Sequence, residues 1–123
     1  MIDTSSEKEK FASQQQTLDF LIHACDSSTS TRKFETLKTW SWLLFEEFFA
    51  QGDSEKVQNR PPSFLCERKT VNIPKEQVGY CNFIVLPLWD LVATIMPKME
   101  PAYQRAEQNR ENWKTYEETD EDK

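Results

Sequence analysis

Apolar residues recur every three to four positions through most of the middle of the chain, the spacing that places side chains on one face of an α-helix. A first helix of this kind ends near Asp26, and the polar segment from Ser27 to Arg32 follows as a loop. Valine, isoleucine and threonine nowhere alternate with polar residues over a useful length. The pattern predicts an all-α fold of four or five helices without a sheet. The second of these helices carries Leu37, Trp40, Leu44 and Phe48.

Glycines and prolines indicate where the helices begin and end. Gly52 is one of two glycines in the chain and should bend or end the second helix. A long polar connection then leads to Pro74, which suits the first turn of a third helix. Pro87 should kink that helix, because proline has no amide hydrogen to donate. Pro97 and Pro101 mark the break before the last helix.

The 123 residues are enough for one small domain, and polarity divides them into three parts. Apolar residues make up 37% of the chain, below the roughly 45–50% typical of globular domains, and they are concentrated in the middle. Residues 1–16 form a polar N-terminal extension, residues 17–116 hold the core, and residues 117–123 form an acidic tail. We expect both ends to be frayed.

Charge and cysteine usage limit the partners and the compartment. The net charge of −6 and the pI of about 4.8 argue against a nucleic-acid partner, which needs a basic face. No run of about 18 apolar residues exists, so we expect no membrane span. Cys25, Cys66 and Cys81 are widely spaced and contain no Cys-x-x-Cys pair, a pattern that fits free thiols in a reducing compartment. These features predict a cytoplasmic protein.

Four short motifs follow one another along the chain. They are His-Ala-Cys-Asp at 23–26, Glu-Glu-Phe-Phe-Ala-Gln-Gly-Asp at 46–53, Gln-Val-Gly-Tyr at 77–80, and Pro-Leu-Trp at 87–89 with Asn-Arg-Glu-Asn-Trp at 109–113. Any one alone is a weak signal, but four in order at matching spacings are a strong one. Through them, residues 17–116 resemble the C-terminal part of the catalytic domain of class I 3′,5′-cyclic-nucleotide phosphodiesterases. The resemblance implies the all-helical fold of that family.

The resemblance makes Asp26 a metal ligand, in a family whose sites hold zinc and magnesium. From the residues alone, Asp26 is a capping residue at the end of a helix. The family's remaining His and Asp ligands, and the histidine that protonates the leaving oxygen, lie upstream of the matched part. His23 is the single histidine of the sequence and is not itself a ligand in the family. No catalytic residue is therefore assigned to this chain, and whether it is an enzyme by itself stays open.

The resemblance makes Gln77, Tyr80 and Leu44 the purine-binding side of a nucleotide site. A side-chain amide offers a donor and an acceptor side by side, which suits the edge of a base. Tyr80 lies one helical turn after Gln77 and stands where the family usually has a phenylalanine that stacks on the base. Leu44 corresponds to the opposing apolar clamp, although it is also a plausible plain core leucine. Thr29 departs from the family, which often has an asparagine there.

Two functions remain open at this point. The first is a part of a cyclic-nucleotide phosphodiesterase that supplies the purine side and one metal ligand, and that is inactive as an isolated chain. The second is a non-catalytic helical module that binds another protein or itself through residues 78–92. The second is supported by an apolar stripe that is wider than the packing of one helical layer requires. Its members are Val78, Cys81, Ile84, Val85, Leu88, Trp89 and Val92. The sequence does not distinguish cAMP from cGMP.

Overall fold

The computed structural model describes the backbone of residues 4–116 and the side chains from residue 13 onward. In this part of the chain all regular structure is helical, which confirms the prediction of four or five helices. The acidic tail at 117–123 lies outside the described residues. The elements are α1 (Thr4–Asp26), the 3₁₀ helix η1 (Ser27–Thr31), α2 (Phe34–Val57), α3 (Ile73–Tyr80), the π-helical turn η2 (Cys81–Val85), α4 (Leu86–Ile95), the 3₁₀ turn η3 (Pro97–Met99) and α5 (Glu100–Thr115).

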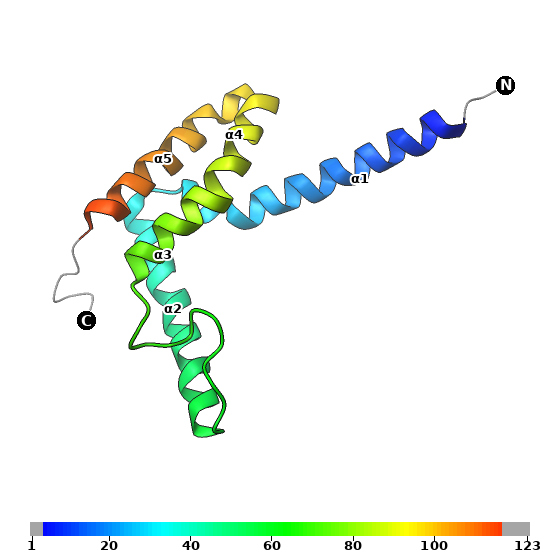
Figure 1. The fold of residues 1–123 in the computed structure, drawn as a ribbon. Helices are drawn as coiled ribbons and strands as arrows, with labels where there is room; N and C mark the ends of the chain where they lie inside the picture. The colour runs from blue at the N-terminus through cyan, green and yellow to red at the C-terminus, as the bar shows by residue number, and fades with distance from the viewer. Residues whose placement is uncertain (1–3, 117–123) are drawn as a thin grey trace.

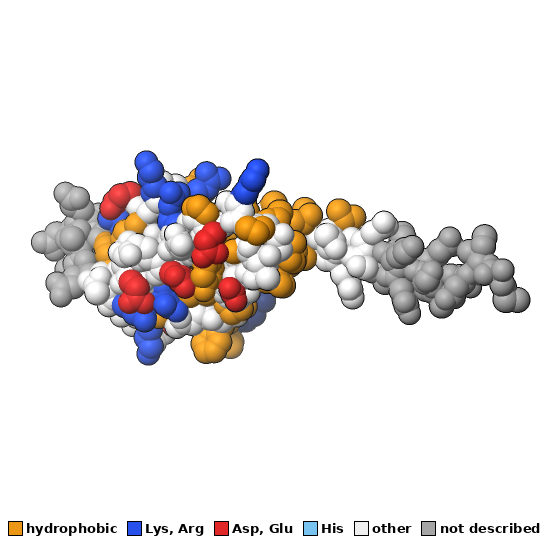
Figure 2. Space-filling model, turned by 90° about the horizontal axis from the view of Figure 1, so that it is seen from above, with side chains coloured by type: hydrophobic (Ala, Val, Ile, Leu, Met, Phe, Trp, Pro, Cys, Tyr) orange, Lys and Arg blue, Asp and Glu red, His pale blue; other side chains and the backbone are white. Residues whose placement is uncertain are grey.

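The helices radiate from a common junction (Figure 1). Helix α1 projects to one side, as the view from above also shows (Figure 2), α2 runs away in another direction, and α4 and α5 lie next to each other. The connection between α2 and α3 returns alongside α2. The core lies where the end of α1 meets α4 and α5, and its buried members are Ala24, Val85, Leu86, Trp89, Val92 and Ala106.

A second packed cluster fixes the start of α2 against the end of α5. The rings of Phe34 and Trp113 meet edge to face with centroids 5.0 Å apart. Trp42 lies 5.9 Å from Trp113, and Tyr116 lies 5.5 Å from it. Such aromatic pairs add about 0.5–1.5 kcal/mol each beyond the area they bury. The cluster therefore holds α2 at a defined angle to α5.

Pro87 shapes the long helix that α3, η2 and α4 form together. A proline in an α-helix removes one backbone hydrogen bond and its ring clashes with the carbonyl four residues earlier. Here the turn before Pro87 widens into a π-helix, in which the Leu86 amide donates to the carbonyl of Cys81, five residues back. The expected irregularity is present, in the form of a π-bulge, which is one recognised cause of helix distortion.

The π-turn also rotates the apolar stripe expected over residues 78–92. Within the turn, Cys81 and Val85 are buried as expected. After it, the inward face continues through Leu86 and Ala93 as well as Trp89. Ile84 was expected in the stripe but is 41% exposed, because the extra residue in the turn moves it outward. Val78 and Leu88 are half-buried.

The continuous helix Ile73–Ile95 has a mean hydropathy of 1.6 over an 18-residue window. By length and composition it could cross a bilayer, even though no uninterrupted apolar run of that length exists in the sequence. One such helix is weak evidence for a membrane span, because the core helix of a soluble protein passes the same test. Here its buried side forms the centre of the core described above.

Gly52 was expected to bend or end α2, and the expected end is wrong: the helix continues to Val57. The glycine serves a different purpose. A β-carbon there would lie 2.8 Å from the carbonyl carbon of Cys66 and closer still to its oxygen. The returning connection is thus in backbone contact with α2, and only a residue without a side chain permits that approach.

We predict that Gly52→Ala lowers the free energy of unfolding by about 1–3 kcal/mol, the usual cost of overpacking a filled site. Gly79→Ala is the matched control, since a β-carbon at that helical position meets no atom within 4 Å. It should stabilise the chain by about 0.5–1 kcal/mol, because alanine is the better helix former. Urea denaturation followed by circular dichroism measures both, and equal effects of the two substitutions would contradict the close approach at Gly52.

Candidate functional site

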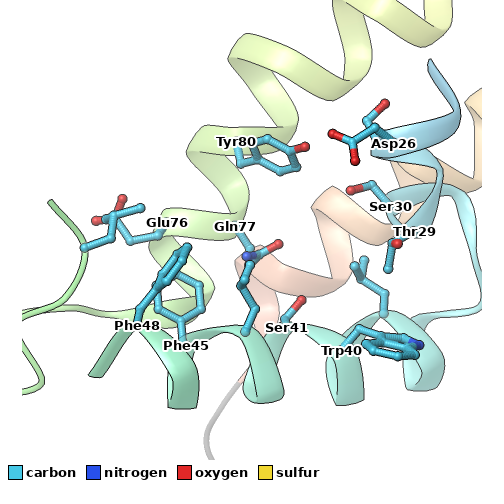
Figure 3. Close-up of a pocket in the computed structure, with 14 residues that line it drawn as sticks. Asp26, Thr29, Ser30, Trp40, Ser41, Phe45, Phe48, Glu76, Gln77 and Tyr80 are labelled. Atoms are coloured by element: carbon cyan, nitrogen blue, oxygen red, sulfur yellow. The ribbon is translucent and has the colours of Figure 1, made fainter. Parts of the chain in front are cut away.

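An open pocket of about 440 Å³ lies where the ends of α1 and η1 face α2 and α3 (Figure 3). This size is within the range of about 300–1,000 Å³ typical of small-molecule sites. Its wall is mostly apolar on the α2 side and polar toward α1 and η1. The lining residues are Asp26, Ser27, Thr29, Ser30, Leu37, Trp40, Ser41, Leu44, Phe45, Phe48, Leu65, Glu76, Gln77 and Tyr80.

The pocket brings together all the site residues that the sequence singled out. Asp26 comes from the end of α1, Leu44 from α2, and Gln77 and Tyr80 from α3. In Figure 3 the side chain of Gln77 points into the space above α2, and Tyr80 points across it toward Asp26. Three elements that are separate in the sequence thus converge on one cavity.

Gln77 lies in the middle of α3, a helix whose start is well defined. The side chain of Asn72 caps it by accepting a hydrogen bond of 3.0 Å from the Lys75 amide, and Pro74 occupies the first turn. Gln77 is 7% exposed, yet among the described residues no hydrogen bond engages its side-chain amide. A buried amide normally has a partner, so this group has its donor and acceptor directed into the pocket for a ligand or water.

Tyr80 forms the side of the pocket nearest to Asp26. Tyr80 is 41% exposed, and its ring is directed into the cavity. Burial raises the pKa of the Tyr80 phenol, and the negative charge of Asp26 raises it further. The hydroxyl therefore stays protonated at ordinary pH and can donate a hydrogen bond.

The α2 residues expected in the core prove to line the pocket. Leu37, Trp40, Leu44 and Phe48 all face it, and Trp40 and Leu44 are largely exposed there. Leu37 is buried together with Ser41, Phe45 and Phe49, so it belongs to the core as well as to the pocket wall. Leu44 is thus a wall residue of the pocket and not a plain core leucine.

Asp26 is exposed at the end of α1. Within the described residues, no group of three or more His, Cys, Asp or Glu side chains lies close enough to hold a metal ion. His23 is exposed as well. The role of Asp26 as one ligand of a metal centre stays a prediction.

Two buried residues that the sequence did not mark as functional hold the polar edge of the pocket in place. Asn109 of α5 is 2% exposed, and its amide donates to the carbonyls of Ser30 at 2.9 Å and Arg32 at 2.7 Å. The indole of Trp89 donates to the hydroxyl of Ser27 at 3.2 Å. Both residues belong to the motifs through which the sequence resembles the phosphodiesterase family, Trp89 to Pro-Leu-Trp and Asn109 to Asn-Arg-Glu-Asn-Trp. Those motifs were the signal that could have identified them.

A model of the 3′,5′-cyclic nucleotide phosphodiesterase family matches residues 1–106. The match covers most of the chain, and the chain belongs to this family. Two Drosophila melanogaster proteins, the 3′,5′-cyclic-AMP phosphodiesterase isoform F and isoforms N/G, are each 34% identical to it over 108 residues, or 87% of the chain.

The fold agrees with a solved structure of the same family. The structure of the Leishmania phosphodiesterase LmjPDEB1 in complex with IBMX superposes on 77% of the chain with a TM-score of 0.70 and 28% identity. The chain spans 29% of that protein, and 16% and 11% of the two Drosophila relatives. It therefore corresponds to a minor part of each of these longer proteins.

We predict that Asn109→Ala lowers the free energy of unfolding by about 1–3 kcal/mol, because it leaves two carbonyl groups without their buried donor. Asn112→Ala on the next turn of α5 is the control, since its side chain bonds Gln108 at the surface. Thermal unfolding followed by circular dichroism measures both. If the two variants unfold alike, Asn109 does not hold η1.

Proposed function

We propose that this chain forms the purine-binding side of the catalytic site of a 3′,5′-cyclic-nucleotide phosphodiesterase. Such an enzyme hydrolyses the cyclic phosphate to the 5′-monophosphate. The observation that carries the proposal is the convergence of Gln77, Tyr80 and Leu44 on one pocket of suitable size. Membership of the family supports it.

In this proposal Gln77 recognises the base. Its amide lies in a mostly apolar cavity and has no side-chain hydrogen bond within the described chain, so a purine edge would supply the missing partners. Either orientation of the amide can serve adenine or guanine, so Gln77 by itself does not select between them. The fly relatives are named as cAMP phosphodiesterases, which makes cAMP the first nucleotide to test.

Tyr80 and Leu44 would hold the base between them. Tyr80 offers an aromatic face from α3, while Leu44 and Phe48 offer an apolar surface from α2. Flat apolar contacts of this kind stabilise any base, whatever its hydrogen-bond donors and acceptors. Stacking on an aromatic ring is worth about 1–3 kcal/mol per base. The neutral phenol of Tyr80 can take part without burying a charge.

Asp26 lies at the other end of the pocket, beyond Tyr80, where the phosphate of a bound nucleotide would point. In a completed site, a pair of divalent ions supplies an activated water and positive charge for the phosphoryl oxygens. Asp26 would contribute one carboxylate to hold them. The remaining ligands must come from residues outside the described part of the chain.

A second candidate, a non-catalytic interaction module, is favoured by a different observation. Large apolar side chains remain exposed on the outer side of α3–α4, namely Phe83, Ile84, Leu91 and Ile95. This face suits either the rest of a catalytic domain or another protein. The two candidates differ in what the pocket does, because substitution of Gln77 would not change the binding of a module that binds only protein.

For either candidate, we propose that the protein is cytoplasmic. The free cysteines support this location, since free thiols persist in a reducing compartment.

We predict that Gln77→Ala weakens the binding of cAMP by about 1–3 kcal/mol, the worth of a well-formed bidentate contact to a base. Isothermal titration calorimetry of the intact chain with cAMP measures this. Glu47→Gln on the exposed side of α2, outside the pocket, is the control and should leave the affinity unchanged. An unaltered affinity in Gln77→Ala would remove the purine-site assignment.

We predict that the purified 123-residue chain does not hydrolyse cAMP or cGMP, even with saturating Mg²⁺, Mn²⁺ or Zn²⁺. It holds one proposed metal ligand and no histidine at the general-acid position, and loss of a general acid alone costs about 10²–10⁴ in rate. Binding energy from Gln77 and Tyr80 cannot compensate, since it stabilises substrate and transition state alike. Turnover that survives purification and disappears in Asp26→Ala would show that the chain builds more of the site.

A further inference from the structure

The connection between α2 and α3 is attached to α2 by a buried carboxylate. Glu55, on the last turns of α2, is buried. One of its oxygens accepts from the Gln51 amide at 2.6 Å and the Ser63 hydroxyl at 2.8 Å. The other accepts from the Ser63 backbone amide at 2.6 Å. The hydrogen bonds from Gln51 and Ser63 lower the pKa of Glu55, so it is ionised at neutral pH.

A second attachment follows three residues later, where the Cys66 carbonyl rests on Gly52. Cys66 itself is buried. Ser63 and Cys66 are therefore both fixed to α2, one through the side chain of Glu55 and the other through direct backbone approach. The two residues between them have little freedom.

Leu65 lies between these two attachments and reaches the pocket. Its φ of 64° is in the left-handed region, which leucine seldom adopts and which costs of order 1–3 kcal/mol unless surrounding structure enforces it. The neighbouring Phe64 is 88% exposed, whereas Leu65 is half-buried and lines the cavity. The strained backbone thus directs one apolar side chain inward and the other outward.

We propose that Glu55 is a positioning residue for nucleotide binding: by holding Ser63 it keeps Leu65 in the wall of the pocket. Glu55 does not line the pocket and acts through Leu65 alone. This inference rests on the proposed function, because it gives Leu65 a ligand to contact. It assigns part of the affinity for the base to a carboxylate outside the site.

Two ion pairs also join the connection to α2, but they lie further along the chain than Leu65. Lys56 pairs with Glu67 at 2.6 Å and Asp53 with Arg68 at 2.9 Å, and both pairs are partly or largely exposed. Exposed ion pairs contribute little, and both lie beyond Cys66 in the chain. Asp53→Asn therefore provides a matched control, because it removes the charge from one of these ion pairs and so weakens a link between α2 and the connection.

The first measurement follows the attachment itself through the reactivity of Cys66. In a Cys25→Ser background, the remaining thiols Cys66 and Cys81 are buried, and burial raises the pKa of Cys81 to about 11. We expect Glu55→Gln to speed labelling of Cys66 by a thiol reagent about tenfold or more, because local opening exposes it, and to leave Cys81 protected. Asp53→Asn should label like the parent.

Ser63→Ala separates opening from a change in thiol reactivity. Burial raises the pKa of the Cys66 thiol, and the charge of Glu55 raises it further, so Glu55→Gln also makes the thiol somewhat more acidic. Ser63→Ala keeps that charge and removes one of the hydrogen bonds to Glu55. Labelling of Cys66 should therefore rise in this variant too. Protection of Cys66 in Ser63→Ala, or equal labelling of Cys66 and Cys81 in Glu55→Gln, would overturn the proposal.

The second measurement is the affinity for cAMP, by calorimetry on the intact chain. Glu55→Gln should weaken binding by about tenfold, since a leucine that leaves the wall takes part of an apolar contact with it. Asp53→Asn should bind like the parent. Leu65→Ala should weaken binding similarly, and adding Glu55→Gln to Leu65→Ala should have no further effect.

The double substitution is the decisive result, because a merely structural role for Glu55 would not make its effect depend on Leu65. Independent, additive effects of the two substitutions would overturn the proposal, as would unchanged affinity in Glu55→Gln. Gln77→Ala distinguishes a failure of the proposed purine site from a failure of the positioning role of Glu55. If Gln77→Ala binds normally, the purine site is wrong; if it binds weakly while Glu55→Gln binds normally, only the positioning role is wrong. Absence of cAMP binding in the unaltered chain would overturn both.

Discussion

The geometry of the pocket depends on the pair of hydrogen bonds that Asn109 of α5 donates to the carbonyls of Ser30, in η1, and Arg32, just after η1. The two bonds link parts of the chain that are more than 70 positions apart. Their donor, Asn109, is buried, where a hydrogen bond left unmade is costly. η1 and the two residues after it connect α1 to α2, so fixing these two carbonyls restricts the angle between those two helices. Asp26 and Leu44, which lie on either side of η1, are thereby held on opposite sides of one cavity.

Periodicity in the sequence was enough to predict the helices, but not which side of each faces inward. Leu37, Trp40, Leu44 and Phe48 do share one face of α2, as their spacing required; that face lines a pocket that is open to solvent. Apolar spacing reports a common face and cannot tell a core from an apolar binding surface. On α3–α4 the same reasoning failed at Ile84, because the π-turn before Pro87 shifts the phase of the pattern.

The site residues were predictable only through the family motifs. Nothing in the composition around Gln77 or Tyr80 distinguishes them from ordinary helical residues, and their assignment came from four motifs at matching spacings. Leu65 and Glu55 lie outside what such reasoning reaches. Their importance depends on a left-handed backbone at Leu65 and on the approach of Cys66 to Gly52, and neither is visible before the connection is seen folded against α2.

Helix α2 links these features, since it carries the apolar wall of the pocket at one end and the attachments of the connection at the other. Leu37 to Phe48 face the cavity, and Gly52 and Glu55 follow within the next two turns. Because a helix is rigid, the residues at its two ends keep a fixed distance and direction from each other. The connection therefore returns to the pocket at a place set by α2 itself, and Leu65 meets the same cavity as Leu44 and Phe48. Glu55 can hold the connection only because α2 continues past Gly52. If the helix ended at Gly52, Glu55 would not lie on it, and Leu65 would lose the attachment that places it in the pocket wall.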